Sequence, residues 1–471
     1  MTMQQLKAQD AQFLYIETGN NLTHVMGVNI YDPSTAPRGK VRFKDIIDHI
    51  ESRLMYSPVF KRRLMRLPLD FDHPYWVEDD FFDIEHHMFH GRLPEPGDWR
   101  QFCIHLARHF SRPMDMNRPL WDMYVIEGLD RIPGIPKGSY AIATRVHHAA
   151  IDGASAMHFF SALSDRDAKG TPAIELEPVT EETGGSPSTF TVLNRALISN
   201  IQSPVKMAST LLKFSPAIFD SILKTLGSDA AKSKKVPQTR FNQPVSPHKM
   251  FEGTRFSLAD MKQIKDHVEG STINDVVLAI CSGALRSYLD HHGELPANPL
   301  VAIAPVNARS SRGDAEAPGN NISAMSVALP THIADPLERL EIIRDTTRQT
   351  KAAKSGISAR LMTDLSKHVP AATMAGVARL VAGGRFTSRF CNLFISNVPG
   401  PQQTLYMNGA KMLHTYGMAP LADGMGLFIA TPSYNGEMTF SIISAREILP
   451  DIEFFRECID ASFEELFEAA R

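Results

Sequence analysis

Two adjacent histidines, His147 and His148, stand shortly before the dipeptide Asp152–Gly153 in the stretch RVHHAAIDGAS. An imidazole has an unperturbed pKa of ~6.5, so at neutral pH it is mostly uncharged and can accept a proton. Such a base activates a hydroxyl without a nucleophilic serine and contributes roughly 10²–10⁴-fold to a rate. The carboxylate of Asp152 could fix the imidazole tautomer or the loop geometry. The stretch is therefore a candidate general-base site, with a metal site and a purely structural histidine pair as the alternatives.

The elements around this motif determine what each histidine can face. The preceding segment SYAIATRV favours a β-strand, so the two imidazoles should point to opposite faces. This arrangement is a poor start for a metal site, which would need further ligands converging from elsewhere. Asp152 and Gly153 fall at the turn before a helix predicted over GASAMHFFSALSD, where aspartate is a natural N-cap and glycine permits tight geometry.

Two other histidine pairs lack the following Asp-Gly. His86 and His87 occur with His90 in IEHHMFHG, where a metal site is possible but not favoured. The pair in LDHHGEL is predicted to cap the C-terminus of a helix that Gly293 ends. The sequence contains no G-x-S-x-G, Walker A, G-x-G-x-x-G or H-E-x-x-H pattern. These absences argue against the most easily recognised hydrolases, nucleotide-binding proteins and zinc proteases.

The composition is typical of a globular protein with more than one domain. The chain has 471 residues, a net charge of -3, 43% hydrophobic residues and 21% charged residues. Nothing in this balance indicates a nucleic-acid partner. The four cysteines are widely spaced, so we expect reduced thiols. No signal peptide and no apolar run of about 20 residues is recognised, so we expect a cytoplasmic protein whose membrane contact, if any, is peripheral.

Helix and strand patterns alternate on both sides of a polar central segment rich in Gly, Pro and Thr. We predict two α/β domains, over residues 1–185 and 246–471, joined by a linker over 186–245. Amphipathic, lysine-containing pieces of the linker could pack on the body or lie on a lipid surface, and the sequence leaves both open. In the second domain, Asn435–Gly436 predicts the turn of a β-hairpin.

The motif and several further blocks resemble a known family. The residues His147 to Gly153 match HHxxxDG, which resembles the signature of CoA-dependent acyltransferases such as chloramphenicol acetyltransferase, carnitine acyltransferases and peptide-synthetase condensation domains. The other blocks, in order, resemble those of bacterial wax ester synthase/diacylglycerol acyltransferases: DAQFLYIETGNNLTHVMGVNIYD, PLW, ND, PVNAR, SNVPGP and LYMNGAK. The resemblance extends from about residue 9 to the C-terminal helix.

The resemblance implies a fold and a reaction. The fold would be α/β (α+β), with two chloramphenicol-acetyltransferase-like domains and an active-site tunnel between them. The reaction would transfer a long-chain fatty acyl group from acyl-CoA, as substrate, to a fatty alcohol or diacylglycerol, with no permanently bound cofactor and no metal. The partners would be these substrates and, through the linker, the inner membrane face or a lipid inclusion. The alternatives are a same-fold acyltransferase with another acceptor or a carrier-bound donor, and a non-catalytic lipid-surface protein.

The resemblance also implies a role for each residue of the main motif. His148 is expected to be the general base and His147 to support it. The turn Asp152–Gly153 is expected to be structural, with its carboxylate bonded to an arginine. Arg309 of PVNAR is the candidate for this arginine, and Arg145 is less favoured because it lies too close to the pair along the strand.

The remaining blocks supply residues for the oxyanion and the channel. The tetrahedral intermediate needs preorganised hydrogen-bond donors, and Asn274 is the expected donor or positioning residue. Asn274 could instead only cap a helix that starts at Asp275. Either Ser396 or Asn397 could touch CoA or the acyl carbonyl. The other members of these blocks are expected to be structural or to shape the channel: Pro119, Leu120, Trp121 and Asp275.

Overall fold

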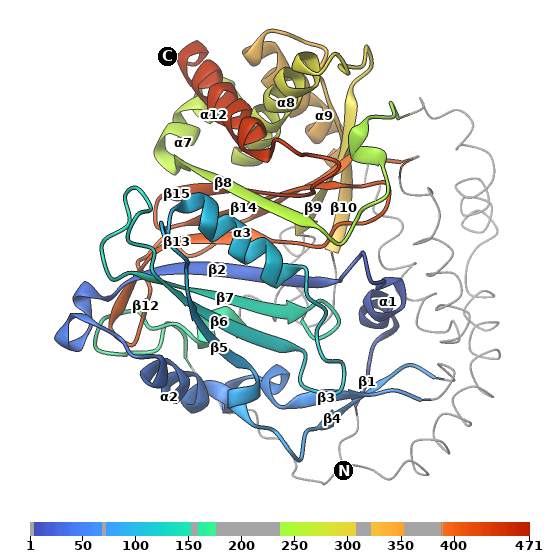
Figure 1. The fold of residues 1–471 in the computed structure, drawn as a ribbon. Coiled ribbons are helices and arrows are strands. Elements are labelled where there is room, and N and C mark those ends of the chain that lie inside the picture. Colours follow the sequence, from blue (N-terminus) through green and yellow to red (C-terminus); the bar gives the residue numbers. More distant parts are fainter. Residues whose placement is uncertain are drawn as a thin grey trace.

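A computed structural model describes residues 4–67, 72–151, 159–175, 236–307, 322–352, 388 and 390–471. Two six-stranded sheets dominate these residues, and they lie one above the other in Figure 1. A third sheet of three short strands lies beside the N-terminal helix, in the order β1–β4–β3. Its strands are β1 (Gln4–Gln5), β3 (Arg62–Met65) and β4 (Tyr75–Glu78).

The first large sheet has the strand order β12–β13–β2–β7–β6–β5. Its strands are β2 (His24–Asp32), β5 (Met88–Arg92), β6 (Trp121–Glu127), β7 (Tyr140–His147), β12 (Tyr406–Met407) and β13 (Ala410–Met418). β7 lies between β2 and β6, is antiparallel to both and is buried along its whole length. Burial on both faces accounts for the apolar run YAIA in the first half of the strand, and it requires buried partners for Arg145 and His147 in the second half.

The second large sheet has the order β10–β9–β11–β14–β15–β8. Its strands are β8 (Lys249–Ser257), β9 (Leu300–Asn307), β10 (Ile322–Leu329), β11 (Leu393–Val398), β14 (Leu427–Tyr434) and β15 (Glu437–Ala445). The predicted hairpin turn at Asn435–Gly436 is confirmed, because both residues have positive φ, 46° and 85°, between β14 and β15.

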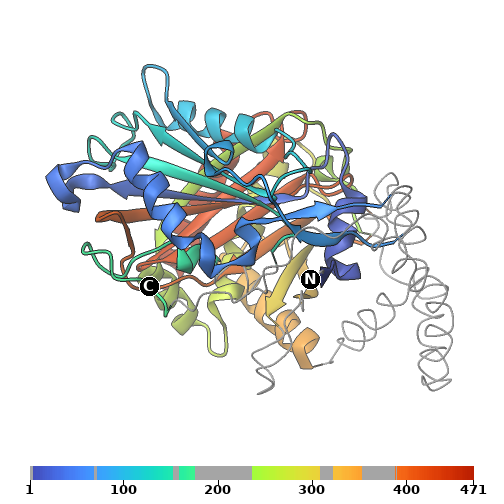
Figure 2. The ribbon, with the colours of Figure 1, turned by 90° about the horizontal axis from the view of Figure 1, so that it is seen from below.

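The helices cover the sheets in layers. α2 (Phe43–Arg53) lies on the outer face of the first sheet (Figure 2), and its Ile46 and Ile50 belong to the buried cluster there. α3 (Trp99–Phe110) lies against the opposite face and reaches the second sheet, where the Trp99 indole donates a hydrogen bond to the Glu252 carboxylate. α3 ends at Phe110, shortly before Pro113. The N-terminal α1 (Ala8–Ile16) lies beside the end of β7 (Figure 1).

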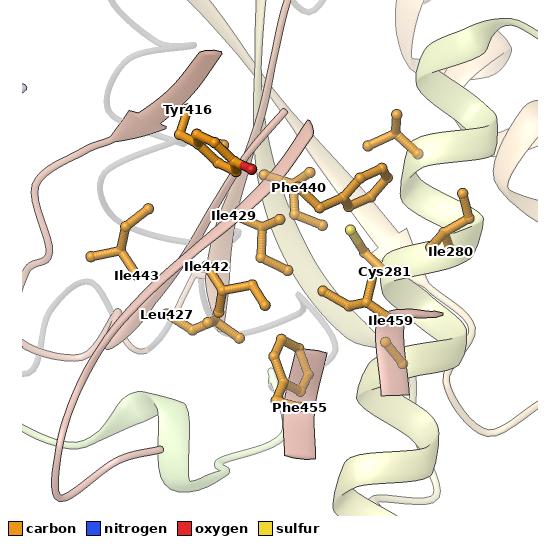
Figure 3. Close-up of a cluster of buried hydrophobic side chains, with 14 of the residues drawn as sticks. Ile280, Cys281, Tyr416, Leu427, Ile429, Phe440, Ile442, Ile443, Phe455 and Ile459 are labelled. Carbon is orange, nitrogen blue, oxygen red and sulfur yellow. The ribbon is translucent and has the colours of Figure 1, made fainter. Parts of the chain in front are cut away.

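Four helices cover the outer face of the second sheet in Figure 1. They are α7 (Leu258–His267), α8 (Ile273–His291), α9 (Pro336–Ala352) and α12 (Ile452–Ala469). Figure 3 shows the buried side chains that meet there: Ile280 and Cys281 from α8, Phe455 and Ile459 from α12, and Ile429, Phe440 and Ile442 from the sheet. Full burial of one such side chain is worth about 1.5–3 kcal/mol, which is how α8 and α12 are fixed to the sheet.

Sheet membership does not follow chain order. β13 comes from the last quarter of the chain, yet it pairs with β2 in the first sheet, with Met418 opposite Met26. β13 also touches the second sheet, where the Thr439 hydroxyl donates to the Thr415 carbonyl at 2.9 Å. The predicted α/β (α+β) class is confirmed. The domain boundaries at 185 and 245 stay a prediction, and the linker helices lie mostly outside the described residues.

Candidate active site

The histidine pair lies at the end of a strand that both neighbours hold in place. In the sheet, His147 pairs with His24 of β2, and Val146 pairs with Trp121 of β6. The His147 amide donates to the Leu120 carbonyl at 2.9 Å, and the chain then turns, with the Ala150 amide donating to the His147 carbonyl at 2.9 Å. The position of the motif is therefore fixed by backbone hydrogen bonds on both sides of β7.

His147 is fully buried and both of its ring nitrogens are engaged. Its Nδ1 accepts a hydrogen bond from the Ala149 amide at 3.0 Å, so the network assigns the ring proton to Nε2. Nε2 then donates to Glu17 Oε2 at 2.9 Å and lies 3.0 Å from the Thr23 hydroxyl. The ring of His147 therefore joins the backbone after β7 to the end of α1.

His148 has different surroundings. It is half-buried, and its ring stacks on Phe13 of α1 with centroids 3.9 Å apart and an interplanar angle of 16°. Its amide donates to the Thr23 carbonyl at 3.0 Å. The two histidines are thus inequivalent, and because β7 ends at His147, His148 belongs to the turn that follows the strand.

Glu17, which follows α1, was not identified from the sequence. Burial raises the pKa of its carboxyl, but hydrogen bonds from His147 and Thr23 outweigh burial and lower the pKa below its ordinary value. The carboxylate is therefore ionised at neutral pH. No local pattern in FLYIETGNNLTH marks this glutamate, because its partner His147 is 130 residues away in the chain.

A second buried network supports the same end of β7. Arg145 forms a bidentate ion pair with Asp122 of β6, with N–O distances of 3.0 and 2.5 Å. Its third nitrogen donates to the carbonyls of His109 and Arg112 at 2.8 and 2.6 Å. Burial raises the pKa of Asp122, but hydrogen bonds from His109 and Arg145 outweigh it and lower that pKa strongly. Arg145 is thus held by buried partners in β6 and at the end of α3, whereas the arginine partner of Asp152 stays a prediction.

His24 completes the polar surroundings of β7. Burial, with the nearby charge of Arg145, lowers the pKa of His24 to about 3, so the ring is neutral at pH 7. Its Nε2 donates to the Phe110 carbonyl at 2.7 Å. The C-terminal end of α3 is thereby attached to β2 as well as to β7.

The PLW residues adjoin the motif as packing residues. Leu120 shares a small apolar cluster with Ala149 and with residues of α1. Trp121 is buried, and its indole donates to the Phe60 carbonyl at 3.0 Å. Pro119 and Trp121 also line a cavity of about 410 Å³ whose walls include Arg145 but neither histidine of the motif.

The ND block is at the start of α8. The suggestion that Asn274 caps this helix is wrong, because Thr272 is the N-cap and α8 begins at Ile273. Thr272 and Asp275 form a reciprocal capping box, in which the Thr272 amide donates to Asp275 at 2.8 Å. Asp275 is buried and also accepts a hydrogen bond from Thr347 of α9 at 2.7 Å. Asp275 is therefore structural, whereas Asn274 is half-buried in the first helical turn.

Ser396 and Asn397 lie near the end of β11, beside β14. Leu393 and Ile395 face the helices, so alternation places Ser396 on the face turned away from them. The following turn requires glycine, because a Cβ on Gly400 would come within 2.2 Å of the Ser433 carbonyl oxygen. None of the contacts described above joins these residues, or Asn274, to the histidine pair.

Some predicted residues lie outside the described part of the chain, namely Asp152, Gly153 and Arg309. The other histidine pairs have partners of their own. The Nδ1 of His87 bonds the Trp121 carbonyl at 2.7 Å, and His90 pairs with Glu127 at 3.1 Å. α8 ends at His291, and Gly293 follows with a φ of 67°, which confirms the predicted helix end.

The described residues contain neither a metal-binding cluster nor a membrane-spanning helix. No three His, Cys, Asp or Glu side chains converge there in a way that could hold a metal ion. Within the same residues, no helix has the length and apolar character needed to cross a membrane.

Comparison with known proteins places the chain among acyltransferases. Residues 6–277 match the wax ester synthase/diacylglycerol acyltransferase catalytic domain, and residues 318–467 match the C-terminal domain of the same family. The chain is 33% identical to a putative diacylglycerol O-acyltransferase of Mycobacterium tuberculosis, over 99% of this chain and 91% of that protein. It is 30% identical to the O-acyltransferase WSD of Acinetobacter baylyi, over 96% and 94% of the two chains.

Solved structures agree with this assignment. The wax ester synthase/diacylglycerol acyltransferase of Marinobacter aquaeolei VT8 superposes with a TM-score of 0.70 at 26% identity, over 99% of both chains. The trichothecene 15-O-acetyltransferase of Fusarium sporotrichioides superposes with a TM-score of 0.61 at 12% identity, over 99% and 95% of the two chains, which is a likeness of fold alone. The expected two-domain, chloramphenicol-acetyltransferase-like architecture is confirmed.

Proposed function

The chain belongs to the wax ester synthase/diacylglycerol acyltransferase family and is an O-acyltransferase, and we propose that its substrates are a long-chain acyl-CoA and an alcohol. The acceptor in this proposal is a long-chain fatty alcohol, a diacylglycerol or both, and the products are wax esters or triacylglycerol. The observation that carries the proposal is the unequal engagement of the two histidines at the end of β7.

This inequality selects the base. His147 is fully buried, and its nitrogens serve the Ala149 amide and the Glu17 carboxylate, so it is not placed to take a proton from an alcohol. His148 is only half-buried, and one face of its ring is covered by Phe13. We therefore assign the general base to His148 and a supporting role to His147.

The proposed reaction is a direct transfer in a ternary complex. His148 takes the hydroxyl proton as the alcohol oxygen attacks the carbonyl carbon of the thioester. The C–O bond forms, and the carbonyl oxygen carries the negative charge of the tetrahedral intermediate. Collapse of the intermediate breaks the C–S bond, and the CoA thiolate leaves with the proton held by the imidazolium of His148. The imidazole is thus regenerated, and no permanently bound cofactor is required.

The remaining assignments complete the proposed site. Asn274 is half-buried, and its side chain does not cap α8, because Thr272 does so. We therefore assign Asn274 as a hydrogen-bond donor to the oxyanion or as a residue that positions the substrate. Asp152 is assigned to holding the turn through an arginine, for which Arg309 is proposed. Ser396 or Asn397 is assigned to the channel wall, near CoA or the acyl carbonyl.

The location of the enzyme is part of the proposal. Its acceptors are water-insoluble, and lysines are interspersed with apolar residues over 191–235, as in helices that lie at a lipid interface. We propose a cytoplasmic enzyme that meets the inner membrane face or lipid inclusions through this segment. Vesicle flotation of the full chain and of a chain lacking residues 191–235 tests the idea, and equal flotation would reject it.

A thiol-release assay tests the activity. Purified enzyme is given palmitoyl-CoA with hexadecanol or dioleoylglycerol, free CoA is measured, and the ester product is identified by chromatography. His148→Ala is expected to lower kcat by roughly 10²–10⁴-fold, the usual contribution of a general base. The matched control is His86→Ala, at an exposed histidine outside the motif. Absence of CoA release with both acceptors refutes the substrate assignment, and full turnover by His148→Ala refutes the assignment of the base.

A further inference from the structure

The N-terminal helix contacts both histidines of the motif. Phe13, on α1, stacks on His148, and Glu17, four residues later, binds His147. Glu17 is the C-cap residue directly after α1, so the two contacts come from the last turn of the helix and from the residue that ends it. We propose that Phe13 and Glu17 act as positioning residues that together hold the histidine pair in its productive geometry. The proposal rests on the assignment of His148 as the base.

Glu17 acts through a single oxygen. Its Oε2 accepts hydrogen bonds from His147 Nε2 at 2.9 Å, from the Thr23 hydroxyl at 2.8 Å and from the Thr23 amide at 3.0 Å. These bonds keep Nε2 protonated, which leaves Nδ1 as the acceptor for the Ala149 amide at 3.0 Å. Through the ring of His147, the Glu17 carboxylate thus fixes the backbone amide of Ala149, the residue after His148. In histidines generally, the group that binds one ring nitrogen sets the tautomer and thereby the role of the other nitrogen.

Phe13 acts on His148 directly. A ring stacked at 3.9 Å blocks rotation of the imidazole about its side-chain bonds and excludes water from one face. The ring edge, where a proton would be accepted, is left uncovered by this contact. The Thr23 carbonyl also accepts a hydrogen bond from the amide of His148 at 3.0 Å. Thr23 therefore holds the backbone of His148, and Phe13 holds its ring.

The helix is itself attached to the motif. The apolar side of α1, with Ala11, Leu14 and Tyr15, packs in one buried cluster with Leu120 and Ala149. Ala149 is the residue after His148, and the carbonyl of Leu120 binds the amide of His147. Displacement of α1 would therefore shift both histidines, and a shift of about 1 Å can cost roughly 10²-fold in rate.

Kinetics of two glutamate variants test the first contact. Glu17→Gln keeps an acceptor oxygen without charge, whereas Glu17→Ala removes the acceptor. We expect kcat to fall about 10-fold for the glutamine and about 10²-fold for the alanine, with KM for acyl-CoA close to wild type. Glu51→Gln, at an exposed glutamate of α2, is the matched control and should be unchanged. An unchanged kcat in both Glu17 variants overturns the role of Glu17.

A spectroscopic arm tests both contacts without turnover. In protein labelled with ¹³C and ¹⁵N at histidine, the stacked ring of Phe13 should shift the His148 ring protons upfield, and Phe13→Leu should move them downfield. Phe81→Leu is the control, because Phe81 is 89% exposed. The His147 nitrogens should report the Nε2–H tautomer, and Glu17→Gln should alter their shifts. Resonances of His147 and His148 are assigned from His147→Gln and His148→Ala.

The two arms separate the possible failures. A wild-type enzyme that releases no CoA refutes the proposed function, and the ring shifts still decide whether α1 holds the pair. An active wild-type enzyme whose ring shifts do not respond to Phe13→Leu or Glu17→Gln refutes the positioning role alone. If Glu17→Ala does not fold, the near-isosteric Glu17→Gln and Phe13→Leu, checked by circular dichroism, carry the test.

Discussion

The ion pair of Asp122 and Arg145 should be among the most sensitive points of the fold. Asp122→Asn keeps the size of the side chain but leaves the guanidinium of Arg145, 3% exposed, without its countercharge. Breaking a buried pair by neutralising one partner costs about 3–5 kcal/mol. If the domain unfolds as a unit of 150–250 residues, this loss lowers Tm by about 6–20 °C, at about 2–4 °C per kcal/mol.

The assay is thermal and denaturant unfolding of matched variants. Asp115→Asn disrupts an ion pair of the same chemistry with Arg118, but on the surface, where such a pair is worth about 0–1 kcal/mol. The double variant Asp122→Leu with Arg145→Met should be more stable than Asp122→Asn, because it leaves no buried charge. A loss in Asp122→Asn no larger than that in Asp115→Asn would refute the reasoning, as would a double variant less stable than the single one.

Two further predictions concern the neighbouring elements. The pKa of His24 is lowered to about 3 in the folded protein, so between pH 3 and 6.5 the unfolded chain binds more protons than the folded one. The contribution of His24 to the free energy of unfolding is therefore greatest above pH ~6.5 and falls as the pH drops toward 3. His24→Gln keeps a donor for the Phe110 carbonyl, so unfolding measured against pH should show a shallower acid slope, and an unchanged slope would contradict the assignment. Gly400→Ala should lower Tm and acyl transfer together, because its Cβ would collide with the Ser433 carbonyl, whereas Gly19→Ala, with open space around it, should match wild type.

Much of the local structure could be predicted from the sequence. Asn435–Gly436 predicted the turn of the β14–β15 hairpin, and Gly293 predicted the end of α8. Each of these depends on interactions between residues close in the chain, or on backbone restrictions of single residues. The cap of α8 was misassigned to Asn274 because Thr272, two positions earlier, offers the same chemistry and forms the box with Asp275.

Contacts between distant segments could not be predicted in the same way. β12 and β13 join the first sheet although β11 and β14, which flank them in the sequence, belong to the second, because strand pairing is decided by the burial of whole faces. The bond between Glu17 and His147 and the ion pair between Asp122 and Arg145 join residues far apart in the chain. No spacing rule connects such residues, so neither network could be found from the pattern alone.

Through the resemblance of HHAAIDG to HHxxxDG and the ordered blocks around it, the sequence by itself predicted that the chain is an acyltransferase of this family, and it predicted unequal roles for His147 and His148. Only the tertiary structure decided how the pair is held. The ring of His147 is locked between the Ala149 amide and the Glu17 carboxylate, and that of His148 rests on Phe13. The physical reason is that an imidazole's tautomer and orientation depend on the groups that bind its two nitrogens and cover its faces. At this site those groups come mainly from an N-terminal helix more than a hundred residues away in the chain.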